Sequence, residues 1–159
     1  MPKPTPPQVS TRNSRIIKPS PGQVYEALMD PQILLRWLPP GDMTGELHDF
    51  EGRVGGGYRM SLFYGSGEPH ARGKATENED RVNVQFLDLQ PGRRVLEAVT
   101  FDSPDPAFHG EMTIEITLAP APGGTEITFV ATNLPPGLRP QDNEEGARLS
   151  LEQLARLFE

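Results

Sequence analysis

The sequence predicts an α+β fold in which a curved antiparallel sheet of about six or seven strands wraps around a long C-terminal helix. Two short helices are expected between the first two strands. The prediction rests on short segments of alternating apolar and polar residues, on the glycine- and proline-bearing turns between them, and on a long C-terminal segment with apolar residues at helical spacing. Strands joined by short turns favour an antiparallel meander, whose apolar face the long helix can cover.

The first residues are poor in apolar side chains. Residues 1–11 are rich in proline, and we expect them to form a disordered tail. The rest of the chain, residues 12–159, is predicted to be a single domain, since a length of 159 residues suits one core. The first strand is predicted over residues 12–18, where it ends before Pro19.

Two helix starts follow in close succession. Ser20-Pro21 supplies a cap and a first-turn proline, and Gln23 completes a capping box. Asp30-Pro31 repeats the cap and the proline, so one helix is expected to end near Met29 and a second to begin at once. The second helix ends at Pro39-Pro40. The two short helices should therefore meet at a bend.

After Gly41 the spacing of apolar residues becomes that of strands. Residues 65–80 are polar and contain glycine, and they are expected to form a long loop. A final helix is predicted over residues 140–158, with an apolar stripe that includes Ala147, Leu151 and Leu154. The arrangement is a helix grip. The strands are predicted over residues 44–50, 58–64, 81–89, 93–101, 109–118 and 125–132.

The composition limits the classes of function. The formal net charge is -7 and the pI is near 5.0, whereas proteins that bind nucleic acids or anionic membrane surfaces usually carry basic patches. There is no cysteine for a disulfide, a thiolate nucleophile or a Cys-based zinc site. No apolar run approaches the roughly 18 residues of a membrane span, and the N-terminus lacks a signal-peptide core. We expect a cytoplasmic protein that neither binds nucleic acid nor inserts into membranes.

Several segments carry a resemblance to a known family. They are VYEALMDPQILLRWLPP at 24–40, FEGRVGGGYRMSL at 50–62, FLDLQPGRRVLEAVTF at 86–101, GEMTIEITLAP at 110–120, GGTEITFVATNLPPG at 123–137 and NEEGARLSLEQLARLFE at 143–159. From residue 12 onward the chain resembles the START/Bet v 1-like (SRPBCC) superfamily, and within it bacterial proteins similar to the C-terminal domain of the activator of Hsp90 ATPase. The resemblance implies a hollow between the sheet and the C-terminal helix, closed at one end by the two short helices.

Residues that alternation or helical spacing turns inward are the candidate ligand-binding residues. Trp37, the one tryptophan, is expected either to fill the core or to form a wall of the pocket. Glu97 shares a strand face with Val95, Val99 and Phe101, which fits either a polar anchor for a ligand or a structural ion pair with an arginine. The full set is Trp37, Tyr58, Met60, Leu62, Glu97, Met112, Ile114, Phe129, Leu151 and Leu154.

No recognised catalytic arrangement is found in the sequence. His48, His70 and His109 are isolated, with none of the spacings that bind metals. Residues 55–57, three glycines, precede a strand rather than a helix, so a turn or bulge is favoured over a phosphate-binding loop. Asp88 is expected to be exposed.

The expected function is binding or sequestration of a small hydrophobic or amphipathic molecule, without metal or other cofactor. The resemblance also leaves open a polyketide cyclase or aromatase-like enzyme, and a co-chaperone or interaction module with an Hsp90-type partner. More weight falls on a protein that is not an enzyme, because no catalytic residues are evident. A homodimer is a further expectation, because sheet edges are often paired.

Overall fold

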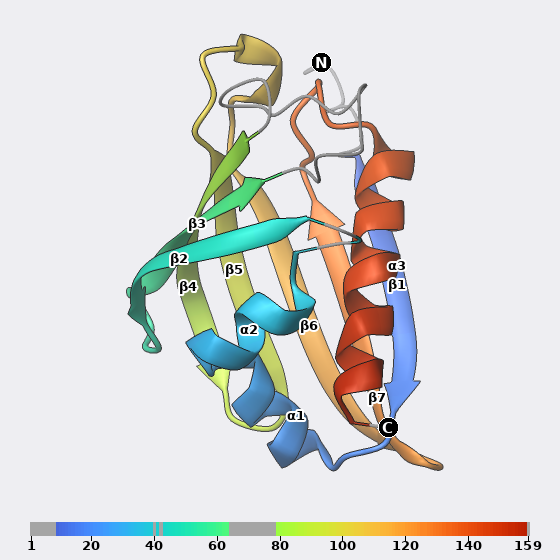
Figure 1. Cartoon of the computed structure of the whole chain (residues 1–159). Coiled ribbons are helices and arrows are strands. Elements are labelled where there is room, and N and C mark those ends of the chain that lie inside the picture. The colour runs from blue at the N-terminus through green and yellow to red at the C-terminus, as the bar shows by residue number, and fades with distance from the viewer. Residues whose placement is uncertain (1–8, 40, 42, 64–78, 159) are drawn as a thin grey trace, which may run out of the picture.

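The computed structural model describes residues 9–39, 41, 43–63 and 79–158. The described residues form seven strands, three α-helices and one short 3-10 helix (Figure 1). The elements are β1 (Ser10–Ile17), α1 (Pro21–Leu28), α2 (Pro31–Trp37), β2 (Thr44–Glu51), β3 (Gly57–Phe63), β4 (Glu79–Gln90), β5 (Arg94–Phe101), η1 (Pro106–Phe108), β6 (Met112–Ala121), β7 (Gly124–Thr132) and α3 (Pro140–Leu157).

The strands form one antiparallel sheet in the order β1-β7-β6-β5-β4-β3-β2. Every neighbouring pair from β2 to β7 is consecutive in sequence, as in a meander, and β1 adds to the far edge by pairing with β7. In Figure 1 the sheet curves, α3 runs along β1, and α1 and α2 lie in front of the middle strands. The predicted helix-grip fold is therefore confirmed.

The two short helices form where their caps predict them. The Ser20 hydroxyl accepts a hydrogen bond from the Gln23 backbone N–H, and the Gln23 side chain accepts one from the Ser20 backbone N–H. Asp30 caps α2 by accepting from the backbone N–H groups of Gln32 and Ile33. These caps satisfy donors that a helix start leaves free.

Some strand boundaries differ from the sequence-based expectation. β1 begins at Ser10, where Asn133 and Leu134 extend the pairing by donating to the carbonyl of Val9. The expectation that His109 opens a strand is wrong, because it follows the 3-10 helix η1 and β6 begins at Met112. The predicted loop at 65–80 lies outside the described residues except for its last two positions, which belong to β4.

A β-bulge in β4 changes which residues face the core. Phe86 pairs with Glu97 while Asp88 pairs with Leu96, so Leu87 is the extra residue on its strand. Leu87 is 40% exposed as a result. The Asp88 side chain is 39% exposed, as expected, and Arg94 donates to its carboxylate at 2.8 Å. Simple alternation therefore places Asp88 correctly and misplaces Leu87, which it turns inward.

The end of α2 is fixed by side chains of α3. Ser150 donates to the carbonyl of Leu38 at 2.7 Å, and Gln153 donates to the carbonyls of Trp37 and Pro39 at 2.7 and 2.8 Å. These carbonyls have no partner within the helix, as is usual at a helix end. The long helix therefore holds α2 against the sheet.

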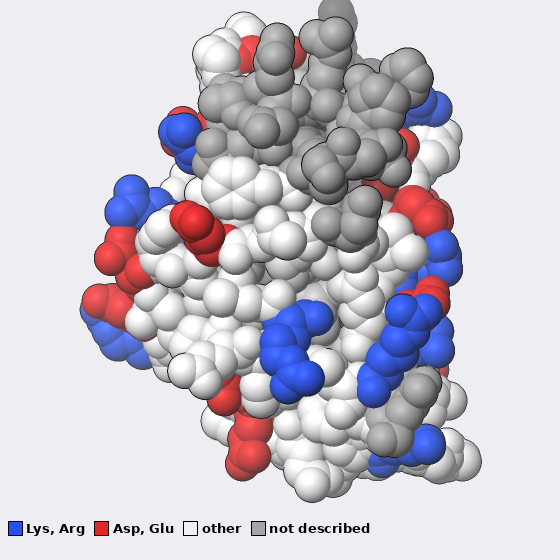
Figure 2. All heavy atoms as spheres, in the orientation of Figure 1, with Lys and Arg blue, Asp and Glu red and all other residues white. Residues whose placement is uncertain are grey.

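The outer surface of α3 carries charges of both signs, whereas the surface over α1 and α2 is mainly uncharged and bears only isolated charged side chains (Figure 2). Arg148 pairs with Glu145 at 2.6 Å and with Glu152 at 3.1 Å, and Arg156 also pairs with Glu152. Within the described residues, no helix combines the length and the apolar character needed to span a membrane.

A candidate ligand-binding cavity

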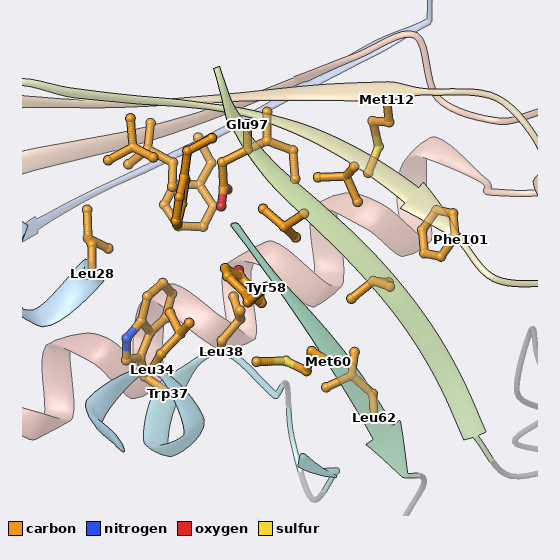
Figure 3. Close-up of a pocket in the computed structure, with 18 residues that line it drawn as sticks. Leu28, Leu34, Trp37, Leu38, Tyr58, Met60, Leu62, Glu97, Phe101 and Met112 are labelled. Atoms are coloured by element: carbon orange, nitrogen blue, oxygen red, sulfur yellow. The ribbon is translucent and has the colours of Figure 1, made fainter. Parts of the chain in front are cut away.

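An internal cavity of about 190 Å³ lies between the concave face of the sheet and the two short helices (Figure 3). Seven elements bring their apolar side chains to it. Its lining consists of Leu28, Leu34, Trp37, Leu38, Tyr58, Met60, Leu62, Val82, Val84, Phe86, Val95, Glu97, Val99, Phe101, Met112, Ile114, Ile116 and Phe129.

Eight of the ten residues singled out in the sequence lie in this lining. Leu151 and Leu154 do not; they are 2% and 0% exposed and pack in the core beneath α3. The difference arises because α3 lies along β1 while α1 and α2 cover the middle of the sheet. The eight lining residues are Trp37, Tyr58, Met60, Leu62, Glu97, Met112, Ile114 and Phe129.

Other lining residues were not among the predicted binding residues, although alternation or helical spacing in the sequence indicated that several of them face inward. On β4, Val82, Val84 and Phe86 alternate toward the cavity until the bulge. On the helices, Leu28 and Leu34 belong to the apolar stripes. The sequence pattern does not give the orientation of α2 on the sheet. That orientation decides which residues of the apolar stripe reach the cavity. The remaining lining residues not singled out are Leu38, Val95, Val99, Phe101 and Ile116.

Trp37 is both a core residue and a cavity wall. Its side chain is 1% exposed, and its ring lies 6.1 Å from that of Phe129, centroid to centroid. Its indole N–H is buried and has no hydrogen-bond partner within the described part of the chain. The two alternatives raised for this residue therefore apply together.

Glu97 is the one charged side chain among the described residues of the lining. It projects from β5 into the cavity, as Figure 3 shows, and is 8% exposed. Burial raises the pKa of its carboxyl group to about 7, while a hydrogen bond from Tyr58 acts in the opposite direction. Burial and the nearby Glu97 hold the pKa of the Tyr58 hydroxyl well above its ordinary value.

Among the described residues, the surroundings of Glu97 lack the arginine partner that one of its two interpretations requires. No arginine, lysine or histidine lies among the described residues of the lining, so a structural ion pair with an arginine is not formed there. Tyr58 supplies a hydrogen bond and no charge. A carboxyl group in an apolar cavity whose pKa is about 7 is suited to binding a polar group of a ligand or to transferring a proton.

A second hollow of about 500 Å³ adjoins the cavity and lies beneath α3. The two share Leu38, Leu62, Phe101, Ile114 and Phe129 as lining residues. Small residues of α3, Gly146, Ala147 and Ser150, leave room there, and a Cβ added to Gly146 would meet no atom within 4 Å. The expected hollow between the sheet and the C-terminal helix therefore exists as an outer chamber, while the inner cavity lies under α2.

Two arginines beside the glycine turn and one histidine lie on the exterior. Arg53 pairs with Glu51 at 2.8 Å and Arg59 with Asp49 at 2.6 Å, all in exposed positions, so these arginines do not reach the cavity. His109 interacts through Nε2 with the carbonyl of Ser103 at 2.7 Å. Within the described ranges, no group of three or more metal-binding side chains comes together.

The run of glycines at 55–57 forms a turn, as predicted. Gly55 has φ of 85° and Gly56 donates to the carbonyl of Arg53 at 2.8 Å. At Gly57 a Cβ would lie 1.9 Å from the carbonyl oxygen of Val84, so glycine is required for the approach of β3 to β4. The turn connects β2 to β3, and it does not precede a helix whose N-terminus could bind a phosphate.

The chain matches a known family over most of its length. The model of the family described as Activator of Hsp90 ATPase homolog 1-like protein matches residues 18–159. The chain belongs to this family. The AHSA1-like family is part of the START/Bet v 1-like (SRPBCC) superfamily, as the sequence resemblance implied. The fold and the family indicate a ligand-binding domain and do not specify a ligand.

Solved structures of bacterial proteins agree with this assignment. Protein CV1439 from Chromobacterium violaceum is 30% identical, with a TM-score of 0.81 over 94% of this chain and 96% of that one. Mll3558 from Rhizobium loti is 28% identical, with a TM-score of 0.73 over the same shares, 94% and 96%. The AHSA1 protein SPO3351 from Silicibacter pomeroyi, at 18% identity and a TM-score of 0.76 over 94% and 96%, shares the fold. No curated protein matches the chain significantly.

Proposed function

We propose that this AHSA1-like protein binds or sequesters a small hydrophobic or amphipathic molecule in the inner cavity. The observation that carries the proposal is an apolar internal space in which Glu97 and Tyr58 are the ionisable side chains among the described lining residues. Ligand sites in proteins typically combine an apolar wall with a few fixed polar groups. A carboxyl group is costly to bury without a cation, and the described lining residues supply none, so a bound polar group would offset that cost.

The size of the space supports a ligand that extends beyond the inner cavity. The inner volume of about 190 Å³ is below the range of roughly 300–1,000 Å³ that is usual for small-molecule pockets. The outer chamber adds about 500 Å³ and is continuous in its lining with the inner one. A ligand with a compact ring and a short apolar tail would occupy both.

A titration with 4-butylbenzyl alcohol tests the proposal, because this probe is uncharged and has such a shape. We expect saturable change in Trp37 fluorescence, excited at 295 nm to avoid the probe, together with a rise in the melting temperature. A ligand at about 100 times its Kd adds roughly 2.7 kcal/mol to the free energy of unfolding. Trp37 is the one tryptophan in the chain, so the signal comes from the cavity wall.

Two variants on β4 provide the comparison. Val84→Phe enlarges a side chain that lines the cavity, and Leu87→Phe makes a similar enlargement on the outer face of the same strand. Binding should be lost in the first variant and kept in the second. Equal binding by both variants, or no binding of the alcohol by the unmodified protein, would overturn the proposal.

Proton transfer to a bound molecule is a second candidate function, favoured by the pKa of Glu97 at about 7. A carboxyl group that titrates near neutral pH can act as a general acid or base, as a cyclase or aromatase-like reaction would require. Glu97→Gln would then abolish turnover while leaving binding of the neutral alcohol in place. The chaperone partner and the homodimer stay predictions from the sequence.

A further inference from the structure

Resting on the proposed ligand-binding function, we infer that the ligand of this site is a hydrophobic amine, whose ammonium group is held between the Glu97 carboxylate and the aromatic rings around it. The inference narrows the ligand to one chemical class. It follows from the charge that lines the inner cavity, from the burial of Glu97 and from the arrangement of the aromatic residues.

The described lining of the inner cavity carries charge of one sign. Its charged side chain is Glu97, and the described lining residues there include no arginine, lysine or histidine. An anionic ligand such as a fatty acid would bring a like charge into this space, whereas a cation is complementary to it.

The burial of Glu97 favours a cationic partner over a neutral one. The carboxyl group is already 8% exposed in the unliganded protein, so binding does not have to remove it from water. An ammonium group that enters the cavity gains a hydrogen bond and a charge–charge attraction to a carboxylate for which the described lining residues offer no other cation. A neutral hydroxyl group can donate to the same oxygen atoms but lacks the charge–charge attraction.

Aromatic rings surround the position that the ammonium group would take. Phe86 pairs with Glu97 across the strands β4 and β5, and the rings of Tyr58 and Phe86 lie 5.9 Å apart. Trp37 adds a third aromatic ring to the lining. Ring faces attract cations, most strongly where water is excluded, so the aromatic wall adds to the preference for an amine.

The arrangement of the residues also gives the direction of binding. Figure 3 shows Glu97 opposite Tyr58, with Leu28 and Trp37 to one side and Leu62 and Phe101 to the other. Leu62 and Phe101 are shared with the outer chamber, so a tail would leave the cavity on that side. The polar head therefore lies inside and the apolar tail points toward α3.

The charge state of Glu97 makes the binding dependent on pH. Tyr58 from β3 is the titratable group that faces it, and the lining residues from α1, α2, β4, β6 and β7 carry no ionisable side chain. Below a pKa of about 7 the carboxyl group becomes neutral, while a benzylammonium probe stays charged. Amine binding should therefore weaken as pH falls, by about tenfold for each unit well below the pKa.

Three probes of matched shape test the inference by calorimetry at pH 8: 4-butylbenzylamine, 4-butylbenzyl alcohol and 4-butylbenzoate. We expect the amine to bind at least tenfold more tightly than the alcohol, and the carboxylate to give no measurable binding. Repeating the titrations at pH 5 should weaken the amine and leave the alcohol unchanged.

Glu97→Gln should remove the advantage of the amine while the alcohol still binds. Glu126→Gln, at an exposed position on β7, serves as the matched control and should behave as the unmodified protein does. If the alcohol binds as tightly as the amine, or if the carboxylate binds, the inference fails and the proposed cavity function survives. If none of the three probes binds, both fail.

Discussion

Glu97 is an ionisable side chain in a buried position, and this has a consequence for stability. It sits on an otherwise apolar strand face, opposite Phe86 on one neighbouring strand and Ile114 on the other. Its hydrogen-bond partner Tyr58 is itself buried. Because it is buried among described residues that supply no cation, the carboxyl group is more easily protonated in the folded protein than in the unfolded chain.

Replacing Glu97 should therefore change how stability depends on pH. Because the pKa rises from 4.5 to about 7 on folding, the folded protein binds more protons than the unfolded chain between these values. The contribution of Glu97 to the free energy of unfolding is thus largest below pH 4.5 and is lost as pH rises through about 7, a change of about 3 kcal/mol.

Urea unfolding at pH 5 and at pH 8 measures this effect. The loss of stability between the two conditions should be smaller by about 2–3 kcal/mol in Glu97→Gln than in the unmodified protein. The exposed Glu126→Gln should keep the original difference. Identical pH dependence in all three proteins would mean that Glu97 is not desolvated in the folded state.

The strand face on which Glu97 lies could be predicted from the sequence, but the pKa of its carboxyl group could not. Period-two alternation placed it with Val95, Val99 and Phe101, which all line the cavity. Whether an arginine lies beside Glu97 depends on the strand order and register, because these bring together residues that are far apart in the sequence. The bulge at Leu87 is a further example, because an extra residue in one strand is invisible to a simple alternating pattern.

At the scale of elements, the position of α2 depends on its attachment to α3. Helices as short as Pro31–Trp37 are not stable alone, so tertiary contacts must hold them. Gln153 alone donates to two carbonyls at the end of α2, those of Trp37 and Pro39. The wall that closes the cavity is therefore anchored by a polar residue on the opposite helix.

Gln153→Ala should loosen this wall. Two carbonyls lose their donor, so we expect a loss of about 1–3 kcal/mol in the free energy of unfolding. The emission maximum of Trp37 should shift to longer wavelength as the ring gains contact with water. The same substitution at the exposed Gln141 of α3 is the control and should alter neither quantity. An unchanged spectrum in Gln153→Ala would show that packing alone holds α2.

Local chemistry was sufficient to predict most elements and insufficient at particular points. Caps and first-turn prolines located α1 and α2, because these signals act within one turn of helix. His109 was assigned to a strand because the residues after it alternate, yet the residues Pro106–Phe108 form a 3-10 turn that keeps it out of β6. A 3-10 turn of three residues is too short to change the spacing of apolar residues noticeably, so the sequence pattern does not reveal it.

For the molecule as a whole, one core joins the sheet to all three α-helices. Val24 of α1, Leu34 of α2 and Leu154 of α3 belong to the same buried cluster as the inward side chains of the strands. We therefore expect cooperative unfolding. Melting curves from far-ultraviolet circular dichroism and from Trp37 fluorescence should coincide. An earlier transition in fluorescence would mean that α2 detaches before the sheet unfolds.

The types of residue that line the candidate cavity could be predicted from the sequence, whereas the place of the cavity in the fold could not. The inward apolar residues of the strands were identified because alternation fixes the face of each side chain. The inner cavity lies under α2 rather than under α3, and Leu151 and Leu154 fill core instead. That outcome depends on which part of the sheet each helix covers, a property of the packed assembly that no single segment encodes.

The pairing of β1 with β7 has a consequence for the order of folding. The register joins Ser10 to Thr132, whereas every other strand pairs with a neighbour in sequence. Loop closure over such a separation costs more entropy than forming a hairpin, so we expect the β2–β7 meander to assemble first. During synthesis β1 emerges from the ribosome long before its partner does. The strands that line the cavity would then form a sheet first, and β1 and α3 would be added afterwards to complete its edge and cover it.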